Sequence, residues 1–439
     1  MSLRVRLDAR SRHPRRSRRR LALLGGTTTW GDCLVAARCL LAPRGLVRGP
    51  AIREYEEAFA SQVGVRHAVS FAAGRVGLYG ILRALGVGEG DEVLLQVPTH
   101  IVVANAIRYT GAEPVYVDCE TENFNIDLRQ AAERITPRTK ILILQHTFGV
   151  PADLDGALAL ARRHNLEVVE DCVHALGATY AGRQVGSFGR AAFFSTEETK
   201  TISSTMGGMV TTDDPELAAR IRAFQESCDL PSTILTARYV LKLALYHVLT
   251  QPYIHRYSRP MYELLGRRHP LPRPTSEEEL RGERPTGYKQ GFSNAQAVLA
   301  LRQLRRLDRN VAHRAAIAEA YRSRLTESGF QVCRPPEHAR PSFVRYPVWV
   351  VNRSDAERAT RPYAVLGSWF TSVLEEAASP IHGGYAEGSC PRAEEASRHL
   401  VNLPTHPQVH MRDVESLVSA LAGVYQGKWS FGYSTEEQR

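Results

Sequence analysis

The chain of 439 residues carries a formal net charge of +10, and 43% of its residues are hydrophobic and 23% charged. This length predicts two or three domains, and the composition is ordinary for a soluble globular protein. Nine arginines and one aspartate lie in residues 1–20, which leaves the rest of the chain near a charge of about +2. We therefore expect no nucleic-acid partner for the folded body.

The first 27 residues form a basic tail, which we expect to be a disordered extension or an overlong start. Such a tail could contact an acidic partner or a membrane surface. The apolar run Leu21–Leu24 is too short for an export signal. The seven cysteines are scattered and contain no Cys-x-x-Cys pair, which favours a reducing cytoplasm over a disulfide scaffold. The spacing of the potential ligands predicts no metal site.

From about residue 65 to about residue 215, short apolar runs alternate with helical patterns, which predicts a mostly parallel sheet. The runs that we interpret as strands are 111–118, 140–146, 166–170, 191–195 and 206–212. Asp171 then falls at the carboxyl end of a strand, where open α/β sheets place their ligands. Ser195 falls at the end of the next strand, and Lys200 on the loop that follows it.

The segment from Asp171 to Lys200 brings together an acid, an imidazole, a hydroxyl and an amine. These are the groups that pyridoxal phosphate (PLP) needs. A lysine amine forms a Schiff base with the cofactor aldehyde, and a carboxylate keeps the pyridinium nitrogen protonated. A hydroxyl such as that of Ser195 can hold the phosphate. Taken singly, the aspartate could be a helix N-cap and the lysine a solvated loop residue.

The segment 234–263 is rich in leucine and valine, but charged residues interrupt it, so it does not predict a transmembrane helix. An amphipathic helix on a membrane surface is one interpretation, and core or dimer-interface packing is the more common one. The following stretch, 267–285, is rich in charge and proline and indicates a loop or linker. Residues 293–325 have helical spacing, and 345–351 have the pattern of a strand.

These motifs resemble the DegT/StrS family of PLP-dependent nucleotide-sugar aminotransferases, from about residue 45 to about residue 424. The segments that carry the resemblance are 45–60, 86–93, 146–153, 168–177 and 195–200. It implies an α/β protein with the type I PLP-dependent aminotransferase fold: a large, mostly parallel-sheet domain and a smaller α+β C-terminal domain. We place the large domain at 28–285, with an insertion at 229–285, and the small domain at 286–439.

The family also implies the reaction, which is amino transfer from an amino acid, glutamate by resemblance, to a keto sugar carried on a nucleotide. Such reactions serve polysaccharide, glycolipid or secondary-metabolite biosynthesis. Lys200 would be the catalytic lysine that holds PLP and moves the proton. Asp171 would face the ring nitrogen, His174 the cofactor hydroxyl, and Ser195 the phosphate. The resemblance further implies a homodimer with its active sites at the interface.

Several positions depart from the family pattern. Ala73-Gly74-Arg75 stands where the family has Ser-Gly-Thr at the start of a helix; the turn at Gly74 still offers backbone N–H groups to a phosphate, and Arg75 could meet it. His100 stands where an aromatic residue stacks on the cofactor, and could also be a helix-start histidine without a ligand. Thr205-Met206 replaces Gly-Glu. Lys289 replaces the asparagine that reaches the partner subunit's phosphate, or is a solvated loop residue.

Three rival functions remain open from the sequence. Relatives that dehydrate sugars carry histidine at the position of Lys200, so the lysine argues against that reaction. A non-catalytic regulatory or binding protein on the same fold is the main alternative, because Arg75, Met206 and Lys289 are altered. A membrane-associated binding protein built around residues 234–263 is the third.

Overall fold

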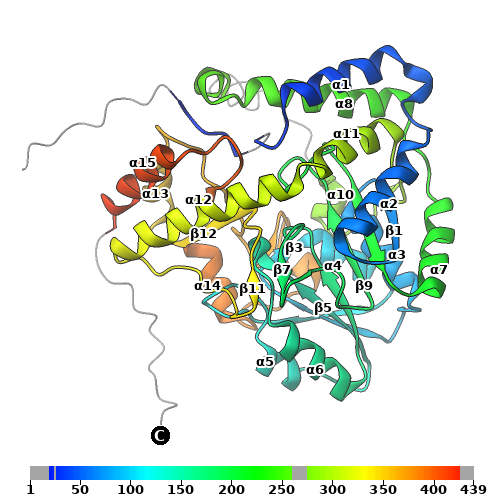
Figure 1. The fold of residues 1–439 in the computed structure, drawn as a ribbon. Coiled ribbons are helices and arrows are strands. Elements are labelled where there is room, and N and C mark those ends of the chain that lie inside the picture. Colours follow the sequence, from blue (N-terminus) through cyan, green and yellow to red (C-terminus); the bar gives the residue numbers. More distant parts are fainter. Residues whose placement is uncertain (1–18, 24–25, 260–273, 426–439) are drawn as a thin grey trace, which may run out of the picture.

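A seven-stranded sheet lies at the centre of the larger part of the molecule (Figure 1). The structure is a computed structural model and describes residues 19–23, 26–259 and 274–425. In spatial order the strands are β1 (His67–Phe71), β10 (Gly208–Thr212), β9 (Ala191–Ser195), β6 (Glu167–Asp171), β5 (Thr139–Gln145), β2 (Glu92–Gln96) and β4 (Glu113–Val117). Only β10 runs antiparallel to its neighbours. The prediction of a mostly parallel sheet is confirmed.

Helices cover both faces of this sheet. On one face, alternate strand residues such as Val93 and Ile143 pack against α3 (Gly74–Ala84), α4 (Ile101–Arg108) and α7 (Pro215–Glu226). On the other face, the intervening residues such as Leu94 and Leu142 pack against α2 (Ala51–Val63), α5 (Leu128–Glu133), α6 (Leu154–His164) and α11 (Asn294–Leu304). Burial on both faces explains why β5 and β2 are almost continuously apolar rather than alternating.

The C-terminal part has a hydrophobic cluster of its own. The antiparallel pair β12 (Arg345–Trp349) and β14 (Leu400–Pro404) packs with α12 (Leu307–Glu327), α13 (Arg353–Thr360) and α15 (Met411–Ala422). The helical pattern at 293–325 is two helices rather than one, because the chain breaks at Arg305 and Arg306. The break allows α11 to pack on α2 of the larger part and α12 on α15 of the smaller part.

The remaining elements are short. They are η1 (Pro43–Gly45), β3 (Thr99–His100), η2 (Thr147–Gly149), β7 (Thr179–Tyr180), β8 (Arg183–Gln184), α10 (Glu277–Leu280), β11 (Ala339–Arg340), β13 (Leu374–Glu375), η3 (Pro380–Gly383) and α14 (Pro391–His399). Parallel pairing of β13 with β3 joins the C-terminal part to the start of α4, at the edge of the candidate site.

The basic tail is described only from Arg19 onward. Leu21 is 1% exposed and bridges to Ala364, and the backbone N–H of Arg20 donates to Pro252 O at 2.8 Å. Residues 19–23, which we assigned to a disordered tail, thus pack against the folded body through an apolar side chain. Residues 1–18 lie outside the described residues, and the proposed domain boundaries stay a prediction.

Helices α1 (Trp30–Leu41) and α8 (Thr233–Leu249) lie side by side as an outer layer above α11 (Figure 1). Their inner sides meet in a small cluster that contains Ala36, Val240 and Leu243, together with Leu299 of α11. Among the helices of the described ranges, none is both long and apolar enough to cross a bilayer.

Candidate active site

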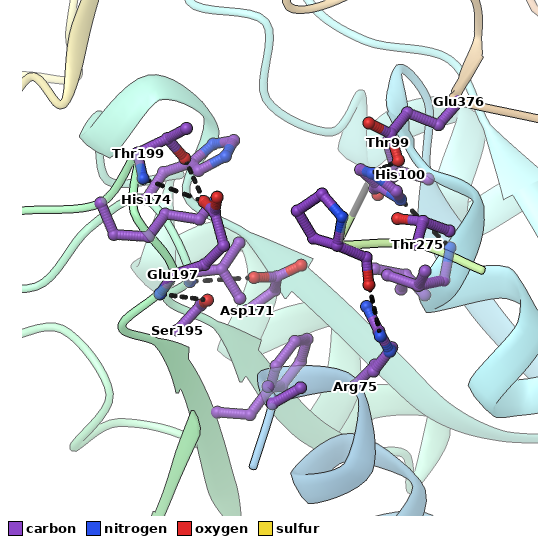
Figure 2. A pocket seen from close by; sticks show the side chains of 18 of the residues that line it. Arg75, Thr99, His100, Asp171, His174, Ser195, Glu197, Thr199, Thr275 and Glu376 are labelled. Atoms are coloured by element: carbon purple, nitrogen blue, oxygen red, sulfur yellow. Dashed lines mark hydrogen bonds and ion pairs between the residues drawn. The ribbon is translucent and has the colours of Figure 1, made fainter. Parts of the chain in front are cut away.

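A pocket opens at the carboxyl ends of β6 and β9, beside the N-terminus of α3 (Figure 2). Asp171 projects into its centre, with His174, Ser195 and Glu197 on one side and Arg75, His100 and Glu376 on the other. Lys200 and Trp369 also line it. The structure therefore brings together seven of the eight predicted site residues: Gly74, Arg75, His100, Asp171, His174, Ser195 and Lys200.

Asp171 ends strand β6 and is 1% exposed. Its Oδ1 accepts a hydrogen bond from the backbone N–H of Val173 at 3.1 Å. Burial raises the pKa of this carboxyl to about 6, while the Val173 N–H and the positive charge of Lys200 act in the opposite direction. A cationic partner, such as a protonated pyridine nitrogen, would stabilise the ionised form of a carboxylate in this environment.

Lys200 lies in the loop between β9 and β10, where its backbone N–H donates to Glu197 O at 3.0 Å. Its Nζ lies 4.2 Å from the centroid of the Trp369 ring. Burial lowers the pKa of Lys200 to about 8; Glu197 and Asp171 raise it, and the neighbouring Arg345 lowers it further. An amine with this pKa is partly neutral closer to neutrality than an exposed lysine, which suits it to act as a nucleophile or a proton carrier.

His174 stacks on Trp369, with ring centroids 4.3 Å apart and planes at 17°. Its pKa lies well below the usual value, first because of burial and then because of the charges of Lys200 and Arg345. Nδ1 of this neutral ring is buried and has no hydrogen-bond partner among the described residues. An unpaired buried nitrogen at the wall of the pocket is suited to a hydrogen bond with a bound group such as a ring hydroxyl.

An anion cradle lies where α3 begins. Ala73 has no side chain that could cap the helix, and Ala73, Gly74 and Arg75 line the pocket, so the positive end of the helix dipole lies at its wall. Ser195 Oγ accepts from the backbone N–H of Glu197 at 3.3 Å, which leaves the hydroxyl proton for an anion. A Cβ on Gly208 would overlap the backbone of Ala73 and Gly74, so glycine lets β10 approach the cradle.

We expect Gly208→Ala to weaken PLP binding at least roughly tenfold, because the methyl group must push the start of α3 away from Ser195. Equilibrium titration of the cofactor-free protein with PLP measures this effect. Gly45→Ala is the matched control, since a Cβ there meets nothing within 4 Å. Equal PLP affinity in the Gly208 variant and the wild type would contradict the assignment of the cradle.

Arg75 lies at the pocket but is engaged by the chain itself. Its Nη2 donates to Pro274 O at 2.9 Å, and Nε lies 2.8 Å from Oε1 of the buried Glu279. Pro274 and Thr275 line the pocket, and Glu279 belongs to α10. The prediction of a loop or linker at 267–285 describes most of this part, but it did not include the capped helical turn α10 that packs beside the site. Residues 260–273 lie outside the described residues.

His100 and Lys289 take different places. His100 caps α4, with Nδ1 accepting from Val102 N at 3.3 Å, while Nε2 lies 3.3 Å from Glu376 Oε2 at the pocket wall. Lys289 does not line this pocket: its Nζ lies 5.9 Å from the ring centroid of Phe224 on α7. Its predicted role toward a partner subunit stays a prediction.

His146, Glu170 and Cys172 form a buried group whose ligand atoms lie within 4.8 Å of one another. The ring nitrogens of His146 are both used, since Nδ1 accepts from Ala152 N and Nε2 lies 3.1 Å from Glu170 Oε2. Both Glu170 oxygens accept backbone N–H groups from residues 186, 188 and 189. The group stabilises that turn behind the site, because the His146 nitrogens and both Glu170 oxygens are engaged in these hydrogen bonds.

Several site residues were not predicted from the sequence: Thr99, Gln145, Glu197, Thr199, Thr275, Arg345, Trp369 and Glu376. Glu197 and Thr199 lie between Ser195 and Lys200, and the short loop could have indicated them. Arg345 and Trp369 come from the C-terminal part, about 150 residues after the lysine, and no local motif marks them.

The residues present fit PLP, because a carboxylate, an amine, an unpaired imidazole nitrogen and an anion cradle converge on one pocket. The fold and the site together define a PLP-dependent aminotransferase. The sequence profile of the DegT/DnrJ/EryC1/StrS aminotransferase family matches residues 35–242 and 248–422. The chain belongs to this family, and the resemblance inferred from its motifs is confirmed.

Two relatives and one solved structure illustrate the match. The chain is 31% identical to the GDP-perosamine synthase of Caulobacter vibrioides over 85% of this chain and 90% of that protein. It is 31% identical to the spore coat polysaccharide biosynthesis protein SpsC of Bacillus subtilis over 87% of this chain and 91% of that protein. The structure of DesV from S. venezuelae in complex with a ketimine intermediate has 28% identity and a TM-score of 0.70, and covers 90% of this chain and 94% of DesV. More distant structures of this fold are described in PLP and pyridoxamine phosphate forms.

Proposed function

We propose that this enzyme transfers an amino group from an amino acid, glutamate by family resemblance, to a keto sugar carried on a nucleotide. The observation that carries the proposal is the convergence of Lys200 and Asp171 on one pocket beside the anion cradle. The family and its sugar-processing relatives support the acceptor class. Since all seven cysteines are unpaired, we place the reaction in the cytoplasm, and by family resemblance in a homodimer.

The cofactor is PLP, which supplies the electron sink when bound. Asp171 would face the ring nitrogen, and Ser195 with the start of α3 would hold the phosphate. Lys200 would hold the cofactor and, once displaced as an amine of pKa about 8, would carry the proton between donor and acceptor carbons. His174 would orient the ring through its free Nδ1. Trp369 closes the side of the pocket that lies toward the C-terminal part.

An amino acid donor needs a cation for its carboxylate, and we infer that Arg345 supplies it. Arg345 is 3% exposed, and its guanidinium carbon lies 3.4 Å from the centroid of the Trp369 ring. Among the described residues, no carboxylate lies within ion-pair distance of it.

A cavity of about 10 Å³, too small to hold a carboxylate, shows which charges surround Arg345. It is lined by Lys200, Arg345 and Arg314, with Glu198 as its one acidic side chain among the described residues, and Lys242 pairs with that glutamate at 2.9 Å. Burial lowers the pKa of Arg345 to about 9, so the buried guanidinium gains from an anion that restores its charged form.

The test of the whole proposal is amino transfer from glutamate to a panel of nucleotide-linked keto sugars, read as formation of the amino sugar by mass spectrometry. Transfer to at least one such sugar is the expected result. Activity with amino acids as the sole acceptors, or PLP binding without turnover on any sugar, would overturn it in favour of another transaminase reaction or of a regulatory protein.

We expect Arg345→Gln to raise the KM for glutamate roughly a hundredfold, because the donor carboxylate loses a buried charged partner. The rate with a primary amine that lacks a carboxylate should stay within about twofold, and the pKa of Lys200 should rise because a neighbouring cation is gone. Arg340→Gln, on the exposed β11, is the matched control. An equal loss with both donors would show a structural role for Arg345 instead.

A further inference from the structure

Helices α1 and α8 expose large apolar side chains on the sides that face away from α11. The exposed fractions are Trp30 58%, Leu34 65%, Leu41 84%, Ile234 69%, Leu241 57% and Leu245 53%. Their spacing of four or seven residues places each set along one stripe of its helix. In the adjoining helical residues 252–259, Tyr253 and Tyr257 are exposed by 58% and 74%. We call this surface the α1–α8 face (Figure 1).

The charges on the α1–α8 face are all of one sign. Residues 33–48 and 232–259 contain no aspartate or glutamate but seven cationic residues, of which Lys242 lies on the inner side of α8 and pairs with Glu198. Arg38, Arg44, Arg48 and Arg238 are exposed. The acid at its margin, Asp32, is buried between Arg302 and Arg306 at 2.9 Å and 2.7 Å. Exposed leucine and tryptophan among arginines, without acids, is the composition of a surface that binds anionic lipid.

The arginine-rich tail enters the described structure at one end of this face. Arg20 N donates to Pro252 O, and the Arg19 guanidinium lies 5.8 Å from the centroid of the Tyr253 ring. Residues 1–18 carry seven further arginines and one aspartate. These residues lie outside the described structure, and only Arg19 is placed beside Tyr253.

We propose that the α1–α8 face docks on the surface of an anionic lipid bilayer, with its leucines and Trp30 at the headgroup boundary and its arginines on lipid phosphates. A second copy of the chain is a poorer occupant, because a two-fold contact would place this cationic, acid-free surface against itself. The inner side of α8 contacts the loop between β9 and β10 that contains Lys200. Lys242 pairs with Glu198 of this loop at 2.9 Å, and Thr205 Oγ1 of the loop donates a hydrogen bond to Tyr239 O at 3.0 Å. Docking would thus bring the loop of Lys200 close to the bilayer.

Vesicle flotation of the full PLP-loaded chain tests this proposal. We expect binding to vesicles of phosphatidylcholine with roughly one third phosphatidylglycerol, weak binding to pure phosphatidylcholine, and loss of binding at high salt. The double variant Leu241→Gln/Leu245→Gln should reduce the partition coefficient roughly tenfold. Ile381→Gln, which changes a 71% exposed isoleucine on η3, is the matched control and should bind like the wild type.

Two further measurements distinguish lipid docking by the α1–α8 face from binding through the tail alone and from self-association. A chain that lacks residues 1–18 should keep its dependence on Leu241 and Leu245, although it binds more weakly. Light scattering should give the same oligomeric state for the wild type and the double variant. No vesicle binding by the wild type, binding that the double variant leaves unchanged, or a change of oligomeric state in that variant would each overturn the proposal.

Discussion

Lys200→Ala is expected to lower kcat by at least roughly 10⁴-fold, because one side chain both holds the cofactor and moves the proton. The variant should still bind PLP through the anion cradle and Asp171, but without the visible absorbance that depends on the lysine. Wild-type absorbance should bleach when glutamate is added, and the variant should show no such change. Visible spectroscopy and single-turnover assays with glutamate measure both effects.

The pKa of Lys200 gives this prediction a pH signature. Only the neutral amine attacks the cofactor aldehyde, so the rate of covalent loading should rise with pH and level off above about pH 8. An ordinary lysine would keep rising toward about pH 10. Lys140→Ala is the matched control, since Lys140 pairs with Asp91 at the far end of β5. Full activity in Lys200→Ala would contradict the assignment of the catalytic residue.

The site residues that could be predicted are those whose position is determined by the strand or turn that contains them. Asp171, Ser195 and Lys200 lie at or just after the ends of neighbouring strands, and the carboxyl ends of parallel strands meet at one edge of a sheet. Their chemistry and their proximity were therefore visible together in one segment. The start of α3 at Gly74 belongs to the same edge, because β10 and β9 run beside it.

The residues that could not be predicted reach the site through tertiary packing. Trp369 and Arg345 arrive from the C-terminal part, whose position depends on how α12 leaves α11. The ion pair between Arg75 and Glu279 joins residues about 200 apart, and the proline and charge of 267–285 suggested only a loop or linker. The composition of 267–285 indicates its local structure, but it does not indicate that this segment packs beside the pocket.

The segment 234–263 illustrates a pattern that the sequence left ambiguous. Its apolar residues predicted either packing or a surface helix, and α8 contains both, because Val240 and Leu243 are buried while Leu241 and Leu245 are exposed. Residues next to one another in a helix point in different directions, so one segment can serve the core on one side and a partner on the other. Only the position of α8 on α11 decides which residues do which.

Asp171→Asn should lower kcat roughly a hundredfold or more while it stabilises the cofactor-free protein. The activity falls because an amide no longer holds the ring nitrogen protonated, and a charge that develops in the reaction loses its stabilisation. A cofactor analogue methylated on that nitrogen, and so permanently cationic, should restore part of the activity in the variant and add none in the wild type.

The gain in stability follows from the pKa of Asp171. In the unfolded chain this carboxyl ionises near its ordinary value of 3.8, whereas burial holds the folded value at about 6. The unfolded state therefore loses its proton first, and stability falls as pH rises between these values. Above about pH 6 the ionised group costs the fold about 3 kcal/mol by linkage, some of which asparagine should recover. Below about pH 4 the two proteins should be equally stable.

Chemical unfolding of the cofactor-free protein at about pH 4 and about pH 7.5 measures this difference, and Asp118→Asn is the matched control. Asp118 is equally buried, but it pairs with Arg392 and accepts the backbone N–H groups of Cys119 and Ala393. Removing its charge should destabilise the fold near neutral pH. If Asp171→Asn raises the free energy of unfolding near neutral pH while Asp118→Asn lowers it, Asp171 is a carboxylate that no cation of the cofactor-free protein compensates. If Asp171→Asn also destabilised the protein near neutral pH, the carboxylate would be structural and its assignment to the ring nitrogen would be wrong.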